Sequence, residues 1–172
     1  MFRWNAIGTK FAVQGISAFD ELELFTAVTQ MDGTFSGSSI VHFKLPANLQ
    51  NLAYMSLSAY NINIAKLVLP STLTAMSNIQ LRGYIGYFEV NSNIVIAPGY
   101  CYGSSIKGNS AYTIAIRYDQ NVLTLSTTGG QGQYYNRHYY YVPDALLDEY
   151  KAASGWSNIT SRIFPISELP TT

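Results

Sequence analysis

An eleven-residue pattern occurs twice in this sequence, each time with a proline at its fifth position. The two stretches are HFKLPANLQNL (42–52) and KLVLPSTLTAM (66–76), and both carry leucine at the fourth and eighth positions. A third stretch, ELELFTAVTQM (21–31), aligns with them and has Phe25 in place of the proline. The copies lie 21 and then 24 residues apart, a spacing typical of leucine-rich solenoids. Such a repeat predicts a stack of similar units.

Three apolar columns run through the copies: Leu24, Leu45 and Leu69; Val28, Leu49 and Leu73; and Met31, Leu52 and Met76. Each unit is expected to begin with a short strand whose alternate side chains, such as Phe43 and Leu45, point inward. Proline lacks an N–H and cannot continue a parallel ladder, so Pro46 and Pro70 should end these strands and turn the chain. The alternative interpretation is two coincidental turns in an ordinary sandwich.

Beyond residue 80 the repeat weakens, and we expect an irregular β region over 83–138. Residues 127–133 (TTGGQGQ) have the composition of a flexible loop, without the spacing or the lysine of a phosphate-binding loop. Further strands are expected at 84–90, 93–99, 112–118 and 121–127, the last two paired across a bend at Asp119 to Asn121.

The C-terminal stretch predicts a helical cap. Pro143 suits the first position of a helix, and Gly155 suits its end. A helix followed by RIFPISEL would cover the open end of a stack. One face of this helix would carry Leu146, Leu147, Tyr150 and Ala153, with Trp156 just beyond. The expected fold is a mostly β single domain over 1–172: a short leucine-rich-repeat-like solenoid (units at 17–82), the irregular β region (83–138) and a C-terminal capping helix within 139–172.

The composition of the chain argues against several classes of function. The ten basic and ten acidic residues balance, which removes the electrostatic attraction that nucleic-acid binding requires. No apolar run reaches the length of a membrane span, and the first residues lack a signal-peptide core, so we expect synthesis in the cytoplasm without membrane insertion. The single cysteine, Cys101, cannot form an internal disulfide.

Few residues suggest catalysis or metal binding. The only histidines are His42 and His138, and Cys101 has no partner cysteine, so we expect neither a metal site nor a cofactor. The acidic residues near Pro143 are explained by their favourable interaction with the positive start of a helix. A polysaccharide-cleaving enzyme would instead need paired carboxylates, for which Glu89 and Asp119 facing each other across a groove are the candidates.

The fourteen tyrosines are the compositional outlier. The run QYYNRHYYY (133–141) must send side chains to both faces of a strand, so some of its rings should lie outside the core. They predict a subunit interface or a sugar-stacking surface, with ordinary packing as the remaining alternative. The candidate binding residues are Tyr134, Tyr135, Asn136, Arg137, Tyr139, Tyr140, Tyr100 and Tyr102.

The repeats resemble the BspA-like leucine-rich repeats common in gut bacteria and their phages. The resemblance covers about residues 17–82, and the segment at 139–169 is similar to the one that ends many such proteins. Ser38 stands where the family motif has cysteine. The residues that match that motif are Phe35, Gly37, Ile40, Phe43, Leu45, Pro46, Leu49 and Leu52.

This resemblance implies adhesion or virion structure and transfers no catalytic residue. The function expected first is a non-catalytic phage virion protein (a fibre head, adhesin or decoration protein) located in the virion. It would self-associate, with a trimer as the favoured state, or bind other virion proteins. It would also contact a glycan or protein of the bacterial surface. The alternative is a leucine-rich-repeat adhesion module of a bacterial cell-surface protein.

Overall fold

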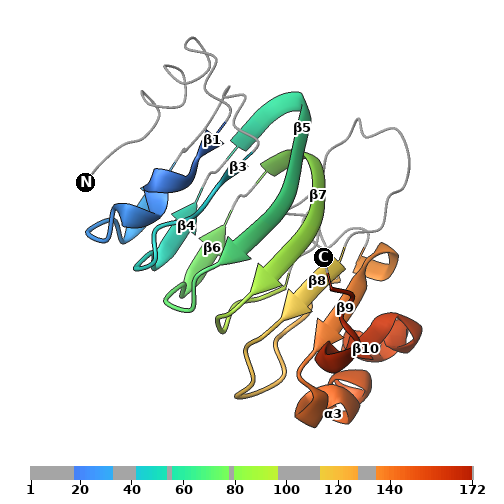
Figure 1. Cartoon of the computed structure of the whole chain (residues 1–172). Helices are drawn as coiled ribbons and strands as arrows, with labels where there is room; N and C mark the ends of the chain where they lie inside the picture. The colour runs from blue at the N-terminus through green and yellow to red at the C-terminus, as the bar shows by residue number, and fades with distance from the viewer. Residues whose placement is uncertain are drawn as a thin grey trace.

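The chain builds parallel sheets with few helices, an α/β-type fold, in a computed structural model that describes residues 18–32, 42–53, 56–77, 80–96, 113–127 and 135–171. The largest sheet has five strands in the order β10-β9-β8-β7-β5, a second has the order β2-β4-β6, and a third pairs β1 with β3. Figure 1 shows these strands following one another along the molecule, with the N-terminal elements at one end and α3 at the other.

The named elements follow in chain order. The strands are β1 (Ala18–Phe19), β2 (Gln30–Asp32), β3 (His42–Phe43), β4 (Asn51–Ala53), β5 (Ser56–Leu69), β6 (Ala75–Ser77), β7 (Gln80–Val90), β8 (Thr113–Ile116), β9 (Tyr139–Val142) and β10 (Ile163–Pro165). The helices are the α-helix α3 (Leu147–Ala152) and the 3-10 helices η1 (Asp20–Leu24), η3 (Tyr135–Arg137), η4 (Asp144–Leu146), η5 (Trp156–Arg162) and η6 (Ile166–Glu168).

Strands pair with strands one unit further along the sequence. The paired residues in the three sheets lie 21 to 26 positions apart, and every pairing is parallel. Met31 pairs with Leu52, which pairs with Met76, so the third predicted column exists in register. The pairing continues beyond residue 80 through β7, β8, β9 and β10. Parallel pairing at this spacing therefore extends beyond the segment in which the sequence repeats.

Alternation within the strands sends every second side chain into one core. Phe43 and Leu45 are buried as predicted, as are Leu67 and Leu69. Each fully buried side chain of this size contributes about 1.5–3 kcal/mol relative to an exposed one. The inward residues of the five-stranded sheet are Leu67, Leu69, Phe88, Val90, Ile114, Ile116, Tyr140, Val142 and Ile163.

Prolines close the turns that follow the strands, as predicted. Pro70 comes directly after β5, and its carbonyl accepts a hydrogen bond from the Leu73 N–H at 3.1 Å. Pro46 makes the same contact with Leu49, also at 3.1 Å. Polar side chains then join one turn to the next: the Thr72 hydroxyl donates to the Leu49 carbonyl at 2.8 Å. The turns are thereby tied together although proline offers no N–H.

The first unit differs from its prediction. Leu24 is 72% exposed, and Leu22 is buried in its place. The reason is an insertion: Phe19 pairs with Phe43 at a separation of 24 residues, whereas Met31 pairs with Leu52 at 21. Three additional residues are accommodated in the turn around η1, which places Leu24 outside the predicted column.

Two strands are longer than the expected short ones. β5 spans 14 residues and β7 spans 11, and Figure 1 shows both as long curved ribbons. Their register shifts between Leu57 and Ile62, and an irregularity of this kind bends paired strands. Proline thus fixes where a strand ends, but it does not fix where the strand begins.

The predicted strand pair at 112–127 is wrong. β8 pairs with β7 and β9, and residues 121–127 contain a single bridge, from Leu125 to Ile96. That bridge is parallel, held by 2.8 Å hydrogen bonds from the Ile96 N–H to the Thr124 carbonyl and from the Ser126 N–H to the Ile96 carbonyl. The stretch connects β8 to β9, which pair in parallel, so it cannot return as a hairpin strand beside β8.

The C-terminal segment keeps the predicted amphipathic face. Tyr150 and Trp156 are buried, and Gly155 adopts a positive φ of 82°, which suits glycine, in the turn between α3 and η5 rather than at the end of α3, where Ala153 is the cap. The helix itself is shorter than predicted, since α3 has six residues. β10 adds a strand beside β9, so a three-residue strand that ends in Pro165 forms the edge of the sheet. A short edge strand with proline resists pairing with further strands.

Candidate functional site

The side of the five-stranded sheet opposite the main core carries mostly polar and aromatic side chains, of which Tyr87 and Ala115 are buried and the others partly or fully exposed. Because the strands pair in register, outward residues form rows that cross the sheet. The first row contains Lys66, Tyr87, Thr113 and Tyr139. The second row contains Val68, Glu89, Ala115, Tyr141 and Phe164. We call this side of the sheet the outward face.

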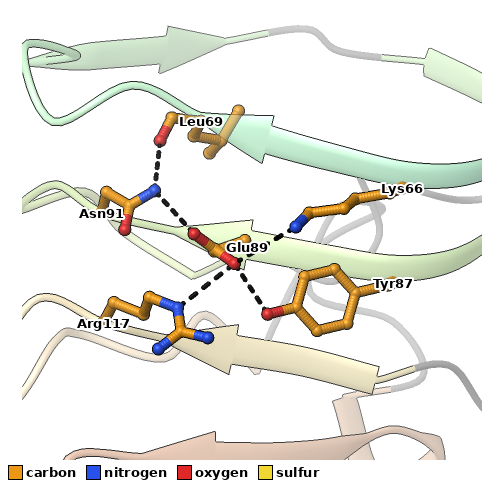
Figure 2. Close-up of polar contacts among 6 residues, drawn as sticks. All are labelled: Lys66, Leu69, Tyr87, Glu89, Asn91 and Arg117. Carbon is orange, nitrogen blue, oxygen red and sulfur yellow. Dashed lines mark hydrogen bonds and ion pairs between the residues drawn. The ribbon is translucent and has the colours of Figure 1, made fainter. Parts of the chain in front are cut away.

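Glu89 is the centre of a polar cluster on the outward face (Figure 2). Its Oε2 accepts a hydrogen bond from the Tyr87 hydroxyl at 2.7 Å and lies 3.2 Å from Arg117 Nε and 3.9 Å from Lys66 Nζ. Its Oε1 accepts from Asn91 Nδ2 at 3.2 Å, and the same amide donates to the Leu69 carbonyl at 3.0 Å. The cluster therefore joins β5, β7 and the residue after β8.

Glu89 stays ionised in this setting. Burial on its own would raise the pKa of the Glu89 carboxyl, but the hydrogen bonds from Tyr87, Asn91 and Arg117 outweigh it and lower the pKa. Burial and the neighbouring carboxylate raise the pKa of Tyr87, which keeps its phenol protonated as a donor. A carboxylate with a lowered pKa is the opposite of a general acid, whose pKa must be raised.

The carboxylate pair considered for an enzyme is not assembled around Glu89. The Glu89 oxygens contact two cations and two neutral donors, whereas Asp119 Oδ1 accepts from Gln120 Nε2 at 2.6 Å in the turn after β8. Within the described parts of the chain, no three His, Cys, Asp or Glu residues gather as a metal site would require. His42 Nδ1 lies 2.8 Å from Asp20 Oδ1 at the other end of the molecule.

Aromatic rings occupy the other end of the outward face. Tyr141 of β9 stacks on Phe164 of β10, with ring centroids 5.5 Å apart and an interplanar angle of 30°. Tyr139 is 42% exposed, and its ring centroid lies 6.2 Å from that of Phe164. The Arg162 guanidinium lies over the Tyr139 ring at 5.3 Å from its centroid, which is a cation–π contact.

Tyr140 was predicted as a binding residue, and this is wrong, because it belongs to the core. It is fully buried, its hydroxyl donates to the Tyr135 carbonyl at 2.7 Å, and its ring packs edge-on against Trp156 at 5.1 Å. Tyr150 also packs edge-on against the indole, at 5.0 Å. Trp156 Nε1 donates to the Leu123 carbonyl at 2.7 Å, and the Leu123 N–H donates to the Tyr150 hydroxyl at 3.1 Å.

The other predicted residues fall into two groups. Tyr135, Asn136 and Arg137 form η3 beside β9, with Asn136 and Arg137 exposed and Tyr135 partly buried. Tyr139 is exposed as expected. Tyr134, Tyr100 and Tyr102 lie outside the described residues, as does Cys101. The prediction that the tyrosine run points to both sides of a strand is confirmed, since Tyr139 and Tyr140 face opposite ways.

Sequence reasoning missed the residues that come from other strands. Lys66, Arg117 and Arg162 were not singled out, and Glu89 was considered only for catalysis. The sequence did contain a signal for them. In KLVL, YFEV, TIAIR and YYYV every second residue points into the core, so the residues between them must face outward. Only the register of the parallel strands brings these residues together.

Comparison of the chain with protein-family models, curated proteins and solved structures found no match to any of them. In the parts of the chain that the structure describes, no helix has the length and apolar character that crossing a membrane requires.

Proposed function

We propose that this chain is a non-catalytic adhesion protein, a short solenoid of the leucine-rich-repeat type that makes its external contact through the outward face. Parallel pairing at intervals of 21 to 26 residues and the proline turns support the repeat architecture. The single observation that carries the proposed function is the aromatic end of the outward face, where the exposed Tyr139 and the partly exposed Tyr141 and Phe164 lie beside Arg162.

The chemistry of Glu89 supports binding over bond cleavage. Its carboxylate accepts hydrogen bonds from Tyr87 and Asn91 and forms ion pairs with two cations of the neighbouring strands, so these side chains restrain one another. A rigid platform loses little conformational entropy when it binds a partner, and tyrosine supplies a stiff apolar ring with a polar tip. These properties suit recognition of a surface molecule.

The family resemblance favours a phage virion as the location of this chain. There the chain would form a homo-oligomer, with a trimer as the favoured state. Light scattering after size exclusion tests this part, because virion appendages are usually closed symmetric assemblies. A stable trimer or larger ring supports the virion. A monomer of 19.0 kDa would overturn that setting and leave the adhesion module of a bacterial cell-surface protein.

Adhesion itself is tested by flow cytometry of fluorescently labelled protein on a panel of gut bacteria. We expect attachment to at least one strain that is abolished by Tyr139→Ala. The matched control is Leu24→Ala, because Leu24 is an exposed apolar side chain at the opposite end of the chain. Attachment to none of the strains, or equal loss with both variants, would contradict the proposal.

A further inference from the structure

The charges that face solvent on the outward face are of one sign. The side chains of Lys66 and Arg117 are 59% and 48% exposed, whereas the Glu89 side chain between them is 12% exposed. Arg162 lies at the aromatic end, beside the exposed Arg137, whose carbonyl accepts from Arg162 Nη1 at 3.3 Å. A ligand approaching this face meets the cations and not the carboxylate.

This positive face belongs to a chain whose net charge is zero. The carboxylates whose side chains the structure describes, other than Glu89, lie in η1, in the turn after β8 and in the helices of the C-terminal segment: Asp20, Glu21, Glu23, Asp119, Asp144, Asp148, Glu149 and Glu168. None of these carboxylates lies in the two rows of the outward face. Complementary charge steers a partner toward such a face and suppresses partners of like charge.

The two cationic ends are separated by an aromatic and small-residue middle. From β7, which holds Glu89, to β10, which Arg162 precedes, the sheet crosses three strand spacings, or about 14 Å. Between the ends lie Thr113, which is partly buried, and Ala115, which is fully buried, with Tyr139 and Tyr141 of β9 next to them. A ligand that spans this distance needs several units, apolar surfaces that lie against rings, and anionic groups for the cations.

We infer that the outward face binds an anionic polysaccharide, with its sugar rings against Tyr139, Tyr141 and Phe164 and its acidic groups paired with Arg162 at one end and with Arg117 and Lys66 at the other. A pyranose ring presents a flat C–H surface to an aromatic ring, and guanidinium matches carboxylate or sulfate in geometry. A second copy of the same face is a poor occupant, since like charges would meet.

The inference rests on the proposed function and adds the class of the ligand. The experiment is a titration by isothermal calorimetry with two matched pairs of polymers. Polygalacturonate is compared with its fully methyl-esterified form, and dextran sulfate with dextran, so that each pair differs in charge and shares its sugar backbone. Poly-glutamate serves as an anion without sugar rings. Repeating the titrations at higher salt tests the charge contribution.

We expect at least one of the two anionic polysaccharides to bind, its neutral counterpart to bind at least tenfold more weakly, and poly-glutamate to bind weakly. Arg162→Gln and Tyr139→Ala should each weaken binding about tenfold or more, because a hydrogen bond to a charged group and a ring contact are lost. Lys44→Gln is the matched control, since Lys44 is an exposed cation paired with Glu23 at the far end of the chain.

Three results would overturn the inference: binding of neither anionic polysaccharide, equal binding of poly-glutamate, or equal weakening by Lys44→Gln and Arg162→Gln. The attachment assay separates this failure from failure of the proposed function. If the labelled chain attaches to bacteria through Tyr139 but binds neither anionic polysaccharide, adhesion stands and the ligand class is wrong. If it attaches to none of them, adhesion itself is wrong.

Discussion

The two sides of the five-stranded sheet use the same residue type for opposite purposes. On the inward side, Tyr140 and Tyr150 pack edge-on against Trp156, and their hydroxyls bond to the backbone. On the outward side, Tyr139 stands beside Tyr140 in the sequence and exposes 42% of its surface. Strand geometry alone separates the two roles, because neighbouring residues in a strand face opposite ways.

The two sides of the sheet also differ in what their polar groups bond to. Inside, the polar tips of Trp156 and Tyr150 bond to the N–H and carbonyl of one residue, Leu123, so the C-terminal segment is fastened to the preceding turn. Outside, Glu89 is held by side chains of several strands, and its cationic partners stay half exposed. We therefore expect inward substitutions to change stability and outward substitutions to change binding.

The largest expected effect is on the inward side. Trp156→Ala should lower the free energy of unfolding by about 3–5 kcal/mol, because it leaves a cavity between two tyrosines and removes the bond to Leu123. Urea denaturation followed by circular dichroism measures the loss. Phe164→Ala is the outward control and should cost clearly less, because Phe164 is only partly buried. Equal losses would break the comparison.

A pH effect follows from His138, which is buried on the inward side of the tyrosine run. Burial, and then the charges of Arg162 and Arg137, lower its pKa from 6.5 to about 4. The unfolded chain takes up the proton first, so stability is fully present above pH 6.5 and is lost as pH falls toward 4. The loss is about 3 kcal/mol for a shift of this size.

Urea denaturation at pH 7.5, 5.5 and 4.5 measures this dependence. In His138→Gln the slope between pH 4 and 6.5 should become shallower, since the titrating group is gone. A wild-type slope that His138→Gln leaves unchanged would show that His138 is not buried as a neutral ring.

A smaller effect is expected at Tyr150. Tyr150→Phe keeps the ring but leaves the buried Leu123 N–H without its acceptor, at a cost of about 1–3 kcal/mol. The matched outward variant is Tyr139→Phe, which keeps an exposed ring and should change the free energy of unfolding by less than about 0.5 kcal/mol. Thermal unfolding of both variants compares them. If Tyr150→Phe leaves the free energy of unfolding unchanged, a water molecule has taken the place of the hydroxyl as acceptor.

Apart from the control variants, the smallest loss of stability is expected on the outward face. Glu89→Gln should cost about 1 kcal/mol at pH 7, a size typical of partly exposed ion pairs. Because the pKa of the Glu89 carboxyl is lowered, this contribution is present above pH 4.5 and is lost as pH falls through the folded-state pKa. The difference between variant and wild type, measured by urea denaturation, should therefore shrink toward pH 3. A constant difference would contradict the ionised cluster.

The local pattern of apolar residues and prolines was sufficient to predict much of the fold. The apolar columns through Leu49 and Leu52, the proline turns and the buried face around Tyr150 were predicted because each follows from residue type and spacing. Leu24 was misplaced because an insertion in a turn does not disturb the apolar pattern. β10 was missed because three residues ending in Pro165 carry almost no strand signal.

The candidate site was only partly predictable. That some tyrosines face outward follows from alternation, but which of them do depends on the register, so Tyr139 was assigned correctly and Tyr140 was not. The Glu89 cluster joins Lys66 and Arg117, which lie 51 residues apart in the sequence. Long-range register of this kind is set by turn lengths, which the sequence pattern beyond residue 80 does not specify.

The central claim is that the inward side of the sheet holds the fold while the outward side is available for contact. Its most direct test is urea denaturation of Tyr139→Ala and Tyr140→Ala, two variants that differ only in which of two neighbouring tyrosines is truncated. We predict a loss of about 3–5 kcal/mol for Tyr140→Ala and less than about 1 kcal/mol for Tyr139→Ala. Similar losses in the two variants, or the larger loss in Tyr139→Ala, would contradict the account.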